Sequence, residues 1–370
     1  MSAISSPAPA RPVSSRADFA HSPMVVFYEL TRACDLACRH CRADAQTCPD
    51  PAELSTDAAR RLVAQLATFP KPPLLVLTGG DPIKRHDVFD IIAAARQAGL
   101  QVALTPSATP LVTREAIQRL KDAGLHRLAV SLDGADAATH DGFRRVAGSF
   151  ERTLEILRDA QACGLPVQVN TTIARHNVHQ VDALAELLAP LGIVLWSVFF
   201  LVPTGRATAE QRIAPETYEE VFSQLLAHLG RQPYAIKTTE APHFRRYVLQ
   251  AAKAAGRAPP PGVPMAGTND GRGVMFVSHT GEICPSGFLP IPCGQFPLDS
   301  VVRVYQESAL FRLLRTPECV SGKCGVCEFR EICGGSRARA YGLTGDPMAS
   351  DPDCVYVPVR WKQEPIPCSV

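Results

Sequence analysis

Three cysteines near the start of the chain, Cys34, Cys38 and Cys41, have a spacing suited to metal chemistry. They follow one another as C-x3-C-x2-C, directly after the apolar run at residues 24–30. Three thiolates on one short loop can bind three irons of a [4Fe–4S] cube and leave the fourth iron without a protein ligand. A zinc site, which favours C-x2-C pairs and a fourth ligand, is the alternative. The spacing favours the open cluster, whose free iron can bind a substrate or cosubstrate.

A second group of cysteines lies near the other end of the chain, with the spacing C-x2-C-x5-C-x20-C. Its members are Cys324, Cys327, Cys333 and Cys354. Four thiols form a closed ligand set for a second iron–sulfur cluster, and the glycines after Cys333 let the backbone approach the sulfides. A four-cysteine zinc site follows the same logic and is again the alternative. A non-catalytic iron–sulfur or zinc protein therefore stays open at this point.

The composition of the chain limits the kinds of molecule that it is expected to bind. The chain of 370 residues has 38 basic and 36 acidic side chains, so no net field attracts nucleic acid or an anionic membrane. Residues 1–22 are rich in proline, alanine and serine, which predicts a disordered tail and no signal peptide. No apolar run is long enough for a membrane span. Thirteen cysteines without a secretory signal favour metal ligands in a reducing cytoplasm, and a small-molecule, cofactor or peptide substrate.

Apolar runs of strand type alternate with amphipathic helical segments and must position these cysteines. The strand-like runs are residues 24–30, 74–78, 101–105, 127–133, 167–173 and 194–202. The helical segments are residues 56–68, 88–98, 114–123, 149–163, 178–191 and 215–229. Six consecutive βα units predict a parallel sheet with right-handed crossovers. Because six units are two short of a closed barrel, we expect an α/β fold with a partial (β/α)6 barrel of the TIM type.

Polar residues fall at the C-terminal ends of these strands, where parallel α/β sheets gather function. After the second strand, Gly79 and Gly80 allow close backbone approach to a ligand and Asp81 supplies an acceptor, although a plain turn also suits this sequence. After the fourth strand, the guanidinium of Arg144 is suited to binding both oxygens of a carboxylate. The alternative is that Asp133 caps the next helix and Arg144 is a solvated surface charge.

These motifs resemble those of the radical S-adenosylmethionine (SAM) enzymes. The resemblance is carried by the C-x3-C-x2-C loop, by Gly79-Gly-Asp-Pro82 in place of Gly-Gly-Glu-Pro, by Ser131-Leu-Asp-Gly134 and by His140-Asp-x-x-Arg144. It implies that SAM chelates the open iron and is cleaved to a 5′-deoxyadenosyl radical, which abstracts hydrogen from a substrate. It also implies a flavodoxin- or ferredoxin-type reductant. The SAM contacts that it implies are Gly79, Gly80, Asp81, Ser131, Asp133, Arg144, Asn170 and Leu201; it assigns no catalytic side chain.

The C-terminal segment is similar to the SPASM extension of these enzymes, which in its fuller form binds two auxiliary clusters. Arg337 stands where that form has a further cysteine, so we predict one auxiliary [4Fe–4S] cluster. Whether Cys284 and Cys293 form a second one is left open. The expected organisation is a tail at residues 1–22, a radical SAM partial barrel at 23–232, a connection at 233–273 and a small cysteine-rich iron–sulfur domain at 274–370.

Further motifs resemble the branch that contains haem-biosynthesis enzymes and the mycofactocin peptide maturase. They are Thr31-Arg-Ala-Cys34, Pro203-Thr-Gly-Arg-Ala207, Pro285-Ser-Gly-Phe-Leu-Pro290 and Gly334-Gly-Ser-Arg-Ala-Arg339. The resemblance implies a tetrapyrrole side chain as substrate, with Arg206, Arg337 and Arg339 as candidate carboxylate partners. A ribosomally made peptide is the alternative. Glu240, His243, Arg245 and Arg246 could also face a substrate carboxylate, or form a solvated face.

Overall fold

A single sheet of ten strands organises the described part of the chain, residues 19–263, 265 and 267–362 of the computed structural model. The strand order is β10-β9-β8-β1-β2-β3-β4-β5-β6-β7. All six expected strands are present within a few residues of their predicted bounds. The bounds are β1 Val25–Thr31, β2 Leu74–Gly79, β3 Gln101–Leu104, β4 Arg127–Ser131, β5 Val167–Ile173, β6 Leu195–Phe200, β7 Ala235–Thr239, β8 Val274–Val277, β9 Glu282–Cys284 and β10 Gly294–Gln295.

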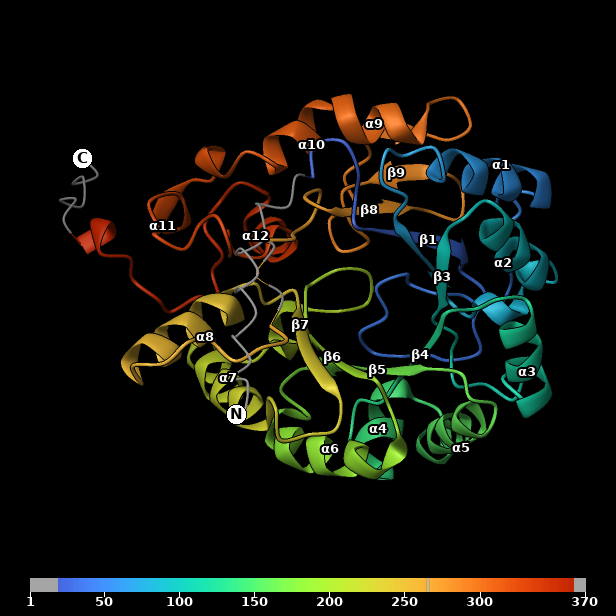
Figure 1. Ribbon diagram of the computed structural model, residues 1–370, viewed down its shortest axis with the longest axis horizontal. Helices are drawn as coiled ribbons and strands as arrows, with labels where there is room; N and C mark the ends of the chain where they lie inside the picture. Colours follow the sequence, from blue (N-terminus) through green and yellow to red (C-terminus); the bar gives the residue numbers. More distant parts are fainter. Residues whose placement is uncertain (1–18, 264, 266, 363–370) are drawn as a thin grey trace, which may run out of the picture.

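Strands β1 to β7 pair in parallel, each with the next, as βα units require. Figure 1 shows them as an arc with α1 to α7 on its outer side and the loop after β1 inside it. The bounds of these helices are α1 Thr56–Leu66, α2 Val88–Gln97, α3 Arg114–Asp122, α4 Ala137–Arg144, α5 Ser149–Ala162, α6 Val181–Leu188 and α7 Pro215–His228. The arc stays open in the described residues, because β7 and β10 are the edges of the sheet. The expected α/β fold with a large parallel sheet is confirmed, with β7 as a seventh parallel strand beyond the six expected.

Local sequence explains how each unit returns to the sheet. Ser55 caps α1 by accepting a hydrogen bond from the backbone N–H of Ala58, and Thr113 caps α3 in the same way. The buried face of α1 includes Leu62 and Leu66, at helical spacing. The strands are largely buried runs of apolar residues, as expected for a parallel sheet covered by helices. The core therefore lies between the sheet and its outer helices.

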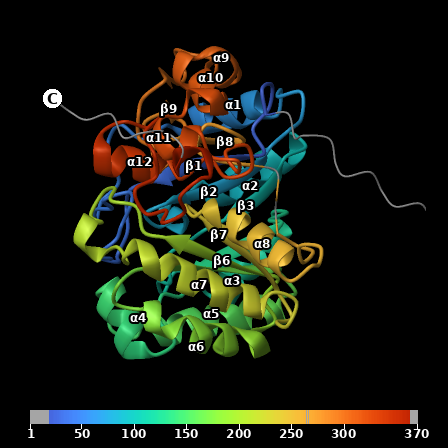
Figure 2. The same ribbon diagram turned by 90° about the vertical axis from the view of Figure 1, so that its left-hand side faces the viewer.

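The C-terminal part of the chain continues the sheet of the barrel. Strand β8 pairs in parallel with β1, with Val25 opposite Val274, and β9 and β10 follow in antiparallel order. The segment expected as a connection contains β7 and helix α8, His243–Ala254. Figure 2 shows the remaining helices together at one end of the molecule, beside β8 and α1. They are α9 Val301–Glu307, α10 Ala309–Leu314, α11 Gly322–Gly325 and α12 Arg337–Thr344.

Two expectations concern the ends of the chain and the membrane. The predicted disordered tail lies mostly in residues 1–18, outside the described residues, whereas Phe19 and Ser22 are buried against the fold. The hydroxyl of Tyr305 donates to the carbonyl of Phe19 at 2.7 Å. Within the described residues, the helices lack the length and apolar character that crossing a bilayer would require.

Candidate functional site

A cavity lies at the C-terminal ends of the barrel strands, against the loop that carries Cys34, Cys38 and Cys41. All three cysteines line it. Six of the eight residues predicted to contact SAM line the same cavity, although their strands are far apart in sequence: Gly79, Gly80, Ser131, Arg144, Asn170 and Leu201. The side chains of Asp81 and Asp133 do not line it. The topology thus brings the cysteine loop and most of the predicted SAM contacts together.

Gly79 and Gly80 hold the cysteine loop against strand β2. The backbone N–H of Gly80 donates to the carbonyl of Thr31, and a Cβ on Gly80 would lie 2.5 Å from the carbonyl oxygen of Ala33. Gly79 has a φ of +145°, and its Cβ would lie 2.2 Å from the carbonyl oxygen of Thr31. Only glycine allows the two backbones to approach so closely. This pair therefore shapes the cluster loop as well as lining the cavity.

Arg206 supports the cysteine loop, contrary to its expected role as a carboxylate partner. Its Nε donates to the carbonyl of Cys38 at 3.0 Å and a terminal nitrogen donates to the carbonyl of Ala45 at 2.8 Å. Its backbone N–H donates to the carbonyl of Cys41. These bonds satisfy loop carbonyls that no secondary structure satisfies. The Pro203–Ala207 motif thus acts as a brace for the loop.

The adjacent Gly205 gives a direct test of this brace. Its φ is +63°, and an added Cβ would lie 2.3 Å from the carbonyl oxygen of Cys41. We expect Gly205→Ala to cost about 1–3 kcal/mol through backbone conformation alone, and more through displacement of the loop. The measurement is the amount of iron bound per chain after anaerobic reconstitution. A free-energy cost of this size should lower that amount by about half or more.

Gly230→Ala is the matched control for this change. Gly230 also has a positive φ, +76°, but an added Cβ would meet no atom within 4 Å. It should share the conformational cost and keep the iron content of the wild type. Equal iron content in the two variants would contradict the brace.

Each sulfur of the loop receives a hydrogen bond that would stabilise a bound thiolate. The backbone N–H groups of Leu36 and Ala45 donate to Cys34 and Cys41, both at 3.3 Å, and Arg144 donates to Cys38 at 3.6 Å. Burial raises the pKa of the Cys34 and Cys38 thiols. Buried thiols are protonated unless a metal binds them, whereas N–H···S contacts are typical around ligated sulfur. The donor set fits an iron–sulfur cluster.

Asp133 positions Arg144 from behind the cavity wall. Its carboxylate lies 2.5 Å from the Arg144 guanidinium, and both side chains are largely buried. Burial would raise the pKa of Asp133, but the Arg144 guanidinium, the two histidines His40 and His140 and the backbone N–H of Thr172 together outweigh it and lower the pKa to about 2. Neither alternative reading holds, because Asp136 caps α4 and the Arg144 side chain is only 13% exposed. Asp133 therefore orients Arg144 rather than lining the pocket itself.

Asp81 has a comparable role at the end of β2. Its carboxylate accepts from the backbone N–H of Ser107 at 3.3 Å and from the hydroxyl of Thr109 at 2.7 Å. The hydroxyl of Ser107 then lies 3.2 Å from the Cys34 sulfur. The expected side-chain contact of Asp81 with SAM is therefore replaced here by a positioning role, while the backbone of Gly79 and Gly80 lines the cavity.

The second cysteine set lies around a separate, smaller cavity, which is lined by Cys324, Cys327, Cys333 and Cys354. Backbone N–H groups of Asp351, Phe329 and Gly335 donate to the first three sulfurs, each at 3.4 Å. The backbone of Tyr356 donates to Cys354. Burial raises the pKa of Cys327 to about 11. Four converging thiols with four N–H donors fit a closed cluster.

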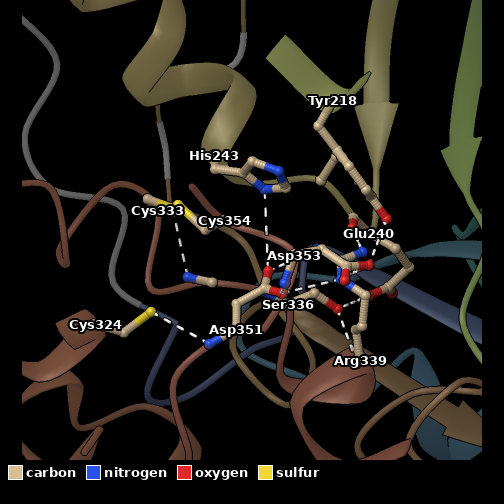
Figure 3. A network of polar contacts seen from close by, with 12 residues as sticks. Tyr218, Glu240, His243, Cys324, Cys333, Ser336, Arg339, Asp351, Asp353 and Cys354 are labelled. Atoms are coloured by element: carbon tan, nitrogen blue, oxygen red, sulfur yellow. Dashed lines mark hydrogen bonds and ion pairs between the residues drawn. The ribbon is translucent and has the colours of Figure 1, made fainter. Parts of the chain in front are cut away.

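A buried polar network joins the second cysteine set to the barrel (Figure 3). Arg339 is fully buried and donates to Asp351 at 2.9 and 2.6 Å, with Asp353 at 3.2 Å. Ser336 donates from its hydroxyl to the carboxylate of Glu240, after β7, at 2.6 Å. Asp351 in turn donates its backbone N–H to the Cys324 sulfur. The network fixes the cysteine loop relative to β7 and α7.

This network corrects the expected role of Arg337 and Arg339 as substrate partners. Arg337 is 2% exposed and donates to the carbonyls of Pro347 and Ala349. Arg339 is 0% exposed and paired with two carboxylates. Neither guanidinium can reach a substrate, and both hold the loop that leads to Cys354.

Cys284 and Cys293 lie on neighbouring segments, at β9 and just before β10. Cys284 is 3% exposed and the Cys293 thiol donates to the carbonyl of Ile291 at 3.5 Å. Cys319 lies apart and exposed in a short 3-10 helix, Pro317–Cys319. The prediction of one auxiliary cluster, without a second at Cys284 and Cys293, stays a prediction.

Sequence reasoning missed several side chains of the first cavity. His40 lines it and stacks on Phe143, with ring centroids 4.0 Å apart. Phe199 of β6 and Phe288 line it too, with ring centroids 6.2 Å apart. The Pro285–Pro290 motif could have indicated Phe288, whereas His40 was hidden inside the cysteine spacing itself.

An open parallel barrel with a three-cysteine loop against its cavity defines a class of enzyme, and comparison with known proteins agrees. A model of the radical SAM superfamily matches residues 28–188. The chain belongs to the radical SAM superfamily, whose members bind a [4Fe–4S] cluster and SAM.

Within this superfamily the chain is similar to proteins named AdoMet-dependent heme synthase. It is 41% identical to that of Nitratidesulfovibrio vulgaris over 345 residues, which covers 91% of this chain and 93% of that protein. It is 39% identical to that of Methanosarcina barkeri, covering 91% and 98%. Streptococcus suis SuiB bound to its precursor peptide SuiA shares the fold, with a TM-score of 0.71, 15% identity and coverage of 91% and 76%.

Proposed function

We propose that this radical SAM enzyme acts on the propionate side chains of an iron tetrapyrrole in haem biosynthesis. The observation that carries the proposal is the similarity of nearly the whole chain to AdoMet-dependent heme synthases. The cavity supports it, because Phe199, Phe288 and Val202 form an apolar wall beside the cysteine loop. Such a wall suits a flat macrocycle, which would bury apolar area against aromatic rings.

In the proposed reaction a propionate becomes a vinyl group. When bound, the cluster and SAM supply a 5′-deoxyadenosyl radical that removes a hydrogen atom from an unactivated C–H bond. Loss of one hydrogen atom from the carbon next to the ring, followed by loss of carbon dioxide and one electron, balances the conversion. The reaction therefore needs a one-electron acceptor as well as a radical source. A second cluster at Cys324, Cys327, Cys333 and Cys354 would supply that acceptor.

The chain's own residues would bind and orient SAM. Arg144, held by Asp133, presents a guanidinium suited to the SAM carboxylate. Ser131 and Asn170 provide hydroxyl and amide groups for polar atoms of SAM, and the backbone near Leu201 borders the apolar end of the cavity. The side chains of Leu36, Ala45 and Ala207 line the cavity near the cysteines and exclude water from the reacting atoms.

We further propose a cytoplasmic location and a flavodoxin- or ferredoxin-type reductant. The twelve cysteines of the described residues are all free thiols, and a reducing compartment keeps them available as metal ligands. Purification without oxygen should give a brown protein with iron and acid-labile sulfide at both sets.

The second candidate substrate is a ribosomally made peptide. The observation that favours it is the shared fold with SuiB, which was solved with a precursor peptide bound. A peptide would need an exposed sheet edge or groove leading to the cavity. The relatives with high identity favour the tetrapyrrole instead.

The deciding experiment is anaerobic incubation of the reconstituted enzyme with SAM, reductant and an iron porphyrin that carries propionates. Mass spectrometry should show the loss of carbon dioxide and two hydrogens per side chain, with 5′-deoxyadenosine formed in parallel. Formation of 5′-deoxyadenosine without any change in porphyrin mass would contradict the proposed substrate. A mass change in a co-expressed peptide instead would favour the second candidate.

A further inference from the structure

Two adjacent arginines lie near the second cysteine set on the barrel side: Arg246 lines its cavity, and Arg245 contacts Ile332, the residue before Cys333. Arg245 and Arg246 lie in the first turn of helix α8, which begins directly after the segment that follows β7. The same turn contributes His243 and Arg246 to the lining of the second cavity. This segment belongs to the barrel side by sequence, yet it faces the four cysteines. The charges of Arg245 and Arg246 therefore act on any group that the four cysteines bind.

Arg246 carries a paired charge. Its terminal nitrogens meet both carboxylate oxygens of Glu219 on α7, one of them at 3.0 Å, and it also donates to Gln250 at 2.9 Å. A bidentate pair of this kind is nearly neutral when seen from outside. Arg246 therefore contributes packing, including a contact with the ring of Tyr356 at 5.1 Å, more than net charge.

Arg245 carries a charge without an acidic partner in the described residues. One terminal nitrogen donates to the carbonyl of Ile332 at 2.8 Å, and the other donates to the carbonyl and hydroxyl of Thr268, both at 3.1 Å. None of the ion pairs found in the described part of the chain includes it. Ile332 is the residue before Cys333, so this bond places the guanidinium beside the backbone of that cysteine.

A half-buried guanidinium that is always charged is costly unless a negative group compensates it. Four cysteine thiolates around a cluster provide net negative charge at this place. Charge interactions are weakly screened at buried positions, so a fixed positive charge there favours the more negative, reduced state of a redox centre. Arg245 supplies such a charge beside Cys333. Two further cations line the cavity: Lys323, which donates to the carbonyl of Cys354, and Arg330, which is paired with Glu318.

We propose that Arg245 is a counter-charge of the second cluster and raises its reduction potential. This inference rests on the proposed binding of a cluster by Cys324, Cys327, Cys333 and Cys354. A higher potential makes the site a better acceptor for the electron released when a propionate is converted to a vinyl group. Arg245 is a positioning residue, because it acts through the cluster and touches no substrate.

The test is the midpoint potential of the second cluster, followed by electron paramagnetic resonance during an anaerobic redox titration. The full chain is used with Cys34, Cys38 and Cys41 changed to alanine, so that the signal comes from the second site alone. Arg245→Gln keeps a donor for the Ile332 carbonyl and removes the charge. We expect its potential to fall by about 59 mV, the one-electron equivalent of a tenfold change in the ratio of oxidised to reduced cluster.

Two further variants separate charge from structure. Arg245→Lys keeps the charge and should restore the potential to near that of the parent chain. The double variant Glu219→Gln/Arg246→Gln removes both members of the paired charge and should leave the potential almost unchanged. Iron and sulfide content per chain should be equal in all of them. An unchanged or higher potential in Arg245→Gln, or an equal fall in the double variant, would overturn the inference.

The same series distinguishes this inference from its premise. If the parent chain with alanines at residues 34, 38 and 41 binds no iron and no sulfide, the cluster at the second site is refuted, and the role of Arg245 falls with it. If that chain binds a cluster whose reduction potential is the same with and without the charge of Arg245, only the role of Arg245 is refuted. The tetrapyrrole substrate is judged separately, by the mass change of the porphyrin.

Discussion

Replacing Cys41 by alanine is expected to reduce the conversion of SAM to 5′-deoxyadenosine to the background of the buffer. Cys41 is one of the three cysteines that line the first cavity, and its sulfur accepts the backbone N–H of Ala45 at 3.3 Å. Removal of one of the three ligands leaves two irons of the cube without protein ligands. The two remaining cysteines are too few to hold the cluster. Chromatography of the nucleoside products after reduction with dithionite gives the measurement.

Cys48→Ala provides the control for this loss. Cys48 lies a few residues further along the same loop, is exposed, and does not line the cavity. Its variant should cleave SAM at the rate of the wild type. If Cys41→Ala cleaved SAM as fast as Cys48→Ala, the catalytic cluster would have to be bound elsewhere.

A large loss of stability is expected from Asp351→Asn. The carboxylate of Asp351 accepts two bonds from Arg339, and both side chains are 0% exposed. Asp353 remains beside Arg339 in this variant, but it is also paired with Arg212, so one buried positive charge stays in excess. Removing one partner of a buried ion pair in this way costs about 3–5 kcal/mol. Urea unfolding of the metal-free chain, followed by circular dichroism, should show this as a lower midpoint with an unchanged slope.

The exposed pair of Arg303 and Glu307 on α9 supplies the comparison. Its atoms lie 3.8 Å apart, and the two side chains are 78% and 57% exposed. Glu307→Gln should change the free energy of unfolding by less than about 1 kcal/mol. Similar losses in Asp351→Asn and Glu307→Gln would refute the structural role of the Figure 3 network.

The sequence was sufficient to predict what local patterns encode. The six barrel strands and the two cysteine sets follow from runs of apolar residues and from spacing along the chain, and the structure places both cysteine sets around cavities. Strand ends meet at one edge of a parallel sheet, which also predicted that Ser131, Arg144 and Asn170 would lie together. These inferences need the order of the elements and no knowledge of side-chain packing.

The direction of each polar side chain could not be predicted, because tertiary packing decides it. Asp81 and Asp133 sit in the expected motifs but point to Thr109 and Arg144 behind the wall. Arg339 is fully buried, although arginine is seldom buried unless it is paired, and its partner follows it by twelve residues through an irregular loop. The expectation that Arg339 would bind a substrate carboxylate was therefore wrong.

The pairing of β1 with β8 has a consequence for the order in which the protein forms. Until residue 277 has left the ribosome, β1 has a neighbour on one side only, at β2, and exposes an unpaired strand edge. The loop of Cys34 follows directly from this strand, and Arg42 of that loop packs on Phe276 of β8. Contacts so distant in sequence form late in folding. Cluster insertion at the N-terminal cysteines must therefore follow synthesis of most of the chain, so a nascent chain stalled before β8 would carry no stable cluster.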